Sequence, residues 1–314
     1  MMTFPQAPSD VVMVRPHHFH PNPETAADNG FQDAHRSDAN TSRAQANQWS
    51  ELGFKEVTHA VQRLRDSGVT VHLFDDHGEK NTPDSVFPNN WFSTHSGGHV
   101  AIYPMYAPNR RRERRSDVIE MLKVQYRVQD VIDYSGLEED GLFLEGTGAM
   151  VLDHIDRVAY AALSKRTSEV LLERFCTHFN YEPLAFPTLG GQDKPVYHTN
   201  VMMCIGTRFA MVGLSLITDV RRRQMVMDRL RGSGRELIEL TNEQIANFAG
   251  NALELTGSAG STLAISERAL KALSAQQRLA LERHTRLLPL QVPTLELAGG
   301  SVRCMLAGIH LAER

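Results

Sequence analysis

The sequence has few cysteines. Only Cys176, Cys204 and Cys304 occur in 314 residues. An odd and small number argues against a framework of disulfides and favours a reducing compartment. We therefore expect a cytoplasmic protein whose cysteines are free thiols.

Long apolar runs are also missing. No stretch approaches the roughly 18 apolar residues of a membrane span. The opening residues, MMTFPQAPSDVVMVRP, lack a basic region followed by a continuous apolar stretch, so we predict no signal peptide and no membrane partner.

The chain has no surplus of positive charge. There are 33 Lys and Arg residues against 37 Asp and Glu, for a formal net charge of −4. A nucleic-acid-binding protein more often has a basic surplus, so we expect no nucleic-acid partner. The run Arg110 to Arg115, RRRERR, is interpreted as a solvated helix start or a surface ion-pair cluster, and Arg221 to Arg223 as a solvated face.

Metal-binding patterns are absent as well. His17, His18 and His20 lie close together, but no second cluster matches them, and the Cys and His residues lack the paired short intervals of a zinc site. We predict no metal.

Short apolar runs alternate with longer charged segments of helical period, which indicates a mixed α/β protein. A helix is predicted from about Thr41 to Ser67, ended by Gly68. The order hairpin, helix, strand recurs over Phe92 to Asp133, Ala149 to Phe186 and Val201 to Leu240, at about 50-residue spacing typical of repeat or propeller architectures. No linker divides the chain, so we expect one domain over residues 1–314.

Residues 15–40 form a long polar segment rich in His, Pro and Asn. Segments of this kind inside compact domains often cover binding sites, so we predict a substrate lid. Arg15 and Asn29 are candidates to contact the α-carboxylate or α-amino group of a substrate.

Cys304 lies in AGGSVRCM, directly after a glycine turn and next to an arginine. Such surroundings favour the thiolate, the form of cysteine that acts as a nucleophile. The other reading is a small buried hydrophobic residue, and that is our expectation for Cys176 and Cys204.

Three more segments carry candidate polar groups. His198 in YHTNV suits proton transfer near neutral pH, although the chain has fourteen histidines. Glu145 in LFLEGTG lies between an apolar run and two glycines, as a buried carboxylate or a solvated turn residue. Asn89 and Asn90 in FPNNW bind a ligand or shape a turn.

Taken in order, FPNNW, LEGTG, YHTN and the terminal GGSVRCM resemble the signature of the guanidino-group modifying superfamily, also called pentein enzymes. The resemblance extends from about Val11 to the end of the chain. It is strongest to the branch that includes citrulline hydrolase and the enzymes related to arginine deiminase and amidinotransferase.

The resemblance implies a five-bladed α/β propeller of ββαβ-like repeats around a central channel. It implies Cys304 as the nucleophile, His198 as the general acid and base, and Glu145 as the carboxylate that holds the substrate. The expected substrate-binding residues are Asn89, Asn90, Asn200, Asn251, Arg15 and Asn29.

Asn90 and Asn200 depart from the pattern of the deiminases, which have an aspartate at each place. Carboxylates suit a guanidinium cation. Amides offer a donor and an acceptor, as an uncharged ureido group needs. The change therefore favours a ureido substrate such as citrulline, cleaved to ornithine, ammonia and carbon dioxide, or a dihydrolase that processes a ureido intermediate. It argues against simple arginine deimination.

Several alternatives stay open from the sequence. The first is an arginine dihydrolase or deiminase, and a less favoured one is an amidinotransferase. A propeller that binds an amino acid without catalysis is the alternative outside the enzymes. The expected partner is a small ureido or guanidino amino acid with no cofactor, and a homo-oligomer is possible.

Overall fold

Within the residues that the computed structural model describes, 5–32 and 42–314, the strands form five separate sheets of three strands each. The middle strand of every sheet pairs antiparallel with one neighbour and parallel with the other. The middle strands are β4 (His99–Ile102), β7 (Val158–Ala162), β10 (Phe209–Val212), β13 (Gly260–Ser266) and β1 (Asp10–Pro16).

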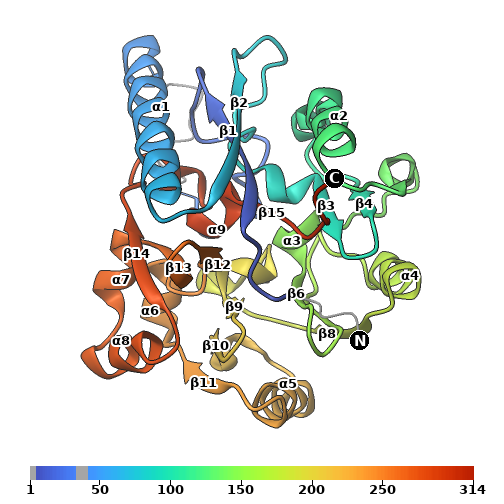
Figure 1. The fold of residues 1–314 in the computed structure, drawn as a ribbon, viewed down its shortest axis with the longest axis vertical. Helices are drawn as coiled ribbons and strands as arrows, with labels where there is room; N and C mark the ends of the chain where they lie inside the picture. Colours follow the sequence, from blue (N-terminus) through green and yellow to red (C-terminus); the bar gives the residue numbers. More distant parts are fainter. Residues whose placement is uncertain (1–4, 33–41) are drawn as a thin grey trace.

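The five sheets are arranged in a ring around one axis (Figure 1). The antiparallel neighbours lie nearest the axis and are the inner strands β3 (Phe92–His95), β6 (Val151–Asp153), β9 (Met203–Ile205), β12 (Leu253–Gly257) and β15 (Ala307–Ile309). The parallel neighbours are the outer strands β5 (Asp130–Asp133), β8 (Glu182–Phe186), β11 (Glu236–Glu239), β14 (Arg286–Leu290) and β2 (Thr70–Asp76).

A helical crossover joins each middle strand to its parallel outer strand, because parallel strands cannot be joined by a tight turn. The crossover helices are α2 (Ser116–Gln125), α4 (Glu169–Phe179), α5 (Val220–Gly232), α7 (Glu267–Ala272) with α8 (Ala275–Glu282), and α1 (Arg43–Asp66). The helices lie at the rim of the ring (Figure 1). The predicted ββαβ propeller is confirmed.

Helix α1 shows how local sequence sets these boundaries. The Ser42 hydroxyl accepts a hydrogen bond from the backbone N–H of Gln45 and caps the start. The buried residues recur at helical spacing and are Trp49, Gly53, Val57, Ala60, Val61 and Leu64. Gly68 follows with φ +86°, and a Cβ there would lie 2.3 Å from the backbone nitrogen of Ser258. The predicted end of this helix at Gly68 is confirmed.

The fifth sheet joins the two ends of the described chain. Strand β15 pairs antiparallel with β1, with Asp10 opposite Ile309, and β1 pairs parallel with β2. The sequence period revealed three of the five repeats. The fourth was missed because no strand was expected at β14, and the fifth because its strands are almost 300 residues apart along the chain.

Apolar middle strands hold the sheets together. Strands β7 and β10 are buried over their whole length, as VAYAA and FAMV, since neighbouring sheets or helices cover both faces. Cys176 and Cys204 are buried in two of the resulting core clusters, as expected. No helix in the described part of the chain is both long enough and apolar enough to cross a bilayer.

Candidate active site

The candidate residues gather because each precedes an inner strand. Just before these strands the chain forms η2 (Pro88–Asn90), α3 (Gly146–Ala149), η6 (Thr199–Val201), the turn at 248–251 and α9 (Val302–Met305). Helix α3 lies against η2 and η6, and α9 lies against η2. Repeated topology thus brings parts of the chain that are distant in sequence to one end of the ring axis.

Cys304 lies on α9 and is 2% exposed. The side-chain amide nitrogens of Asn200 and Asn251 each lie 3.3 Å from its sulfur and donate to it. The thiol of Cys304 in turn lies 3.7 Å from the side-chain oxygen of Asn200. Burial raises the pKa of Cys176 and of Cys204 to about 12.

Asn251 also fixes the helix that carries the cysteine. Its amide nitrogen donates to the carbonyl of Asn200 at 3.0 Å, and its side-chain oxygen accepts from the backbone N–H of Arg303 at 3.0 Å. The side chain is fully buried. Asn251 therefore joins three of the segments that form the site.

Glu145 and His198 form a buried pair. The His198 Nε2 lies 2.7 Å from Glu145 Oε2, and the other carboxylate oxygen accepts from the backbone N–H of Tyr106 at 2.9 Å. Burial lowers the pKa of His198 to about 4 against the opposing effect of Glu145. Burial would raise the pKa of Glu145, but Arg166, His198 and Arg110 outweigh it and keep that pKa below its usual value. The pair is therefore a carboxylate and a neutral imidazole that donates from Nε2 and leaves Nδ1 unprotonated.

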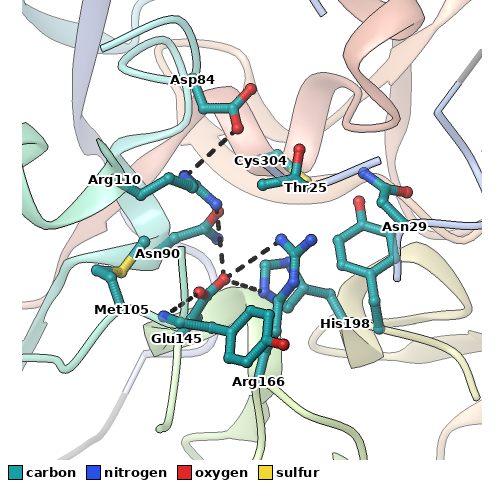
Figure 2. Close-up of polar contacts among 12 residues, drawn as sticks. Thr25, Asn29, Asp84, Asn90, Met105, Arg110, Glu145, Arg166, His198 and Cys304 are labelled. Carbon is teal, nitrogen blue, oxygen red and sulfur yellow. Dashed lines mark hydrogen bonds and ion pairs between the residues drawn. The ribbon is translucent and has the colours of Figure 1, made fainter. Parts of the chain in front are cut away.

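Two arginines surround the same carboxylate (Figure 2). The guanidinium groups of Arg110 and Arg166 approach Glu145 Oε2 to 3.5 and 3.6 Å. Arg110 is also bidentate to Glu113, and its Nε lies 3.6 Å from Asp84. The interpretation of RRRERR as a solvated helix start or a surface ion-pair cluster is therefore wrong at Arg110, which is 2% exposed.

Residues 17–32 pack over this end of the ring and, together with Arg15 and Pro16 at the end of β1, are the described part of the predicted lid. Asp28 accepts two hydrogen bonds from Arg166, at 2.7 and 2.9 Å. The Asn29 amide donates to the carbonyl of Ala298, just before the glycine turn of Cys304. The rest of the predicted lid, from residue 33, lies outside the described residues.

Arg15 does not join this group. Its guanidinium makes two hydrogen bonds to Asp75, at 2.7 and 3.0 Å, and lies over the ring of Phe54. With its charge paired there, the structure gives no support to the expected contact of Arg15 with a substrate carboxylate.

Some buried polar atoms near the site have no partner among the described residues. Asn89 Oδ1 accepts from the Asn90 amide at 2.9 Å, but Asn89 Nδ2 has no partner. The Oδ1 of Asp84 also has none, whereas its Oδ2 accepts from Asn22. Such groups are costly to bury, so they are candidates to bind a ligand.

Sequence reasoning missed Arg110, Arg166, Asp84 and Asp28. Nothing within RRRERR marks one arginine as buried, and Arg166 lies in a polar stretch, SKRTS, without a motif. An acidic partner close in sequence, Glu113 for Arg110, was the one available signal.

Gly148 keeps the free nitrogen of His198 accessible. A Cβ at this position would lie 2.3 Å from Asn90 Nδ2 and 2.8 Å from His198 Nδ1. We expect Gly148→Ala to lower kcat about 100-fold and stability by about 1–3 kcal/mol, because a well-packed site does not accept the methyl group. Kinetics and denaturant unfolding measure the two effects. Gly136→Ala is the control, since a Cβ there meets nothing within 4 Å. Unchanged kcat in Gly148→Ala would contradict this geometry.

Comparison with known proteins agrees with the fold. The family model described as eukaryotic N,N dimethylarginine dimethylhydrolase matches residues 15–311. No curated protein sequence matches the chain.

Solved structures of similar fold include three proteins. The N-terminal domain of ArgZ, an arginine dihydrolase from the ornithine–ammonia cycle in cyanobacteria, has a TM-score of 0.73 and 16% identity, covering 96% of this chain and 97% of that one. Unliganded AgrE has a TM-score of 0.74 and 16% identity, covering 97% of this chain and 40% of that one. A mutant dimethylarginine dimethylaminohydrolase from Pseudomonas aeruginosa, complexed with citrulline, has a TM-score of 0.64 and 13% identity, covering 98% and 100%.

Proposed function

We propose that this chain, which belongs to the N,N dimethylarginine dimethylhydrolase family among the guanidino-group hydrolases of the pentein superfamily, hydrolyses citrulline. The products are ornithine, ammonia and carbon dioxide. Cys304 acts as nucleophile and His198 as general acid and base. Glu145 orients His198.

The observation that carries this proposal is the pair of amides at the reacting centre. Asn200 donates to the Cys304 sulfur, and Asn90 lies beside Gly148 and His198. A guanidinium cation there would need a carboxylate, whereas a neutral ureido group needs donors and acceptors together. Glu145 contacts Tyr106, His198 and the two arginines. Its negative charge therefore stabilises these groups and not a substrate cation.

The other end of the site suits an amino acid. Asp84 Oδ1 is a buried acceptor without a partner, which complements an α-ammonium group. Arg166 holds the carboxylate of Asp28 in a bidentate contact, and an α-carboxylate offers the same chemistry. The contacts of Asp28 with Arg166 and of Asn29 with Ala298 would then break when residues 17–32 open to admit the substrate.

The steps balance with one water per citrulline. His198 takes the thiol proton at Nδ1, and the Cys304 thiolate attacks the ureido carbon to form a C–S bond. The tetrahedral adduct breaks one C–N bond, and the departing nitrogen takes the proton from His198. Water, deprotonated by His198, then cleaves the C–S bond, and the carbamic product splits into carbon dioxide and the second amine.

Glu145 supports both proton transfers. An imidazolium forms twice in this sequence, and a buried carboxylate at 2.7 Å stabilises it. The amides of Asn90 and Asn200 hold the terminal ureido groups as the tetrahedral adduct forms.

The double change Asn90→Asp and Asn200→Asp tests the role of the amides. A carboxylate beside the sulfur opposes the thiolate and repels the ureido oxygen. We expect kcat/KM for citrulline to fall about 10- to 100-fold, and the ratio of arginine to citrulline turnover to rise. Asn242→Asp, at an exposed asparagine that starts α6 (Asn242–Ala246), is the control. An unchanged preference would contradict the assignment.

The main rival is an arginine dihydrolase, which is the activity of ArgZ. A dihydrolase consumes arginine and releases two ammonia molecules, whereas the proposed enzyme leaves arginine intact. Assays on citrulline, arginine and N,N-dimethylarginine side by side distinguish the possibilities. A kcat/KM for arginine above that for citrulline would overturn the proposal.

A further inference from the structure

A small cavity lies on the ring axis, apart from the residues of the candidate active site. Its volume is about 40 Å³, several times what one water molecule needs. Residues from all five inner strands line it, among them Thr94, Leu152, Cys204, Leu253 and Gly308. Cys304, His198 and Glu145 are not among its lining residues.

The guanidinium of Arg303 is the charged group of this cavity. Its side chain makes one hydrogen bond within the described residues, from Nη1 to the carbonyl of Leu306 at 2.9 Å. It takes part in no ion pair in that part of the chain, and no Asp or Glu lines the cavity. The remaining guanidinium N–H groups have no acceptor among residues 5–32 and 42–314.

A nearby carboxylate, Glu254, is already engaged. It accepts hydrogen bonds from the backbone and hydroxyl of Thr207 and from the hydroxyl of Ser261. Burial lowers the pKa of Arg303, as expected of a cation without a carboxylate partner. Arg303 is only partly exposed, and a cation that has lost much of its solvent is stabilised by a counter-ion.

Histidines add N–H groups to the same space and no negative charge. His154 and His310 both line the cavity and stack with ring centroids 3.9 Å apart. The Nδ1 of His310 is buried and has no hydrogen-bond partner among the described residues. The guanidinium of Arg157 lies nearby over Tyr181, whose hydroxyl bonds to His154. The side chains that line the cavity are therefore cationic or neutral.

We propose that this axial cavity binds one small monovalent inorganic anion, of the size of chloride, held by Arg303. The volume accepts such an ion with one or two water molecules. The inference does not depend on the substrate of the active site, because the cavity and the catalytic residues share no lining group.

Bromide is the probe in crystals of the whole protein, because its anomalous scattering identifies it. We expect a bromide peak within hydrogen-bond distance of the Arg303 guanidinium. Surface peaks without one at Arg303 would overturn the proposal.

Thermal unfolding tests the same site in solution. When sodium chloride replaces sodium gluconate at equal ionic strength, we expect Tm to rise by about 3 °C at tenfold excess over Kd. Arg303→Gln should abolish the rise, and Arg221→Gln, on the exposed start of α5, should keep it. A bromide peak in the crystal without any chloride dependence of the wild-type Tm would indicate binding at crystal concentration only. This outcome would also contradict the proposal. Neither measurement uses catalysis, so each outcome is independent of the proposed function.

Discussion

Replacing Cys304 by alanine is expected to lower kcat on citrulline by about 10⁴-fold or more, because a residue that forms the covalent bond has no substitute in the site. Asn200 and Asn251 donate to this sulfur, and within the described part of the chain no side chain donates to the other two thiols. The fold should persist, since the change removes one small buried atom. Steady-state assays of ornithine and ammonia release measure the loss.

Cys176→Ala is the matched control for this variant. Cys176 lies on the buried face of α4, and its raised pKa keeps it a thiol. We expect it to retain nearly full kcat. Near wild-type turnover in Cys304→Ala would show that Cys304 is not the nucleophile.

Replacing Glu145 by glutamine is expected to have the second largest effect. The change keeps the shape but leaves Arg110 and Arg166 facing each other without the shared negative charge, at a cost of about 3–5 kcal/mol of stability. We also expect kcat to fall about 100- to 1000-fold, since the imidazolium of His198 loses its stabilising partner. Denaturant unfolding and kinetics measure the two losses.

The pH profile separates orientation of His198 from a merely structural role. Glu145 opposes the effect of burial and raises the pKa of His198, which nevertheless stays near 4. Without the carboxylate this pKa falls further, so the acid limb of kcat/KM, which reports protonation of His198, should move to lower pH. Glu236→Gln, at a partly exposed ion pair with Arg283, is the control and should leave the limb in place. An acid limb that does not move in Glu145→Gln would contradict the assigned role.

The sequence predicted the reacting centre better than its surroundings. Glu145, His198, Asn200 and Cys304 lie in short motifs beside glycines or aromatic residues, and the fold brings all four together. Asn251 was named too, and its three contacts explain why an amide is needed there.

Charged groups around the centre were not predictable in the same way. Arg110 and Arg166 are buried because they meet Glu145, Glu113 and Asp28, and those meetings depend on tertiary packing. Local charge patterning assigns such arginines to solvent, since isolated charges are rarely buried. The pairing of Arg15 was not predictable either, because its partner Asp75 is on the adjacent parallel strand.

The fold, like the site, was predictable only where the evidence for it is local in the sequence. Three repeats with contiguous strands were visible as a period, whereas the sheet that closes the ring pairs residues near the two ends of the chain. Such long-range pairing leaves no local pattern.

The central claim is that Cys304 forms a bond to the ureido carbon of citrulline. The direct measurement uses citrulline labelled at that carbon, with acid quenching during turnover and peptide mass spectrometry. The account predicts label on the peptide that contains Cys304 in the wild type and none in Cys304→Ala. Steady release of ornithine with no label on Cys304 at any quench time would contradict it.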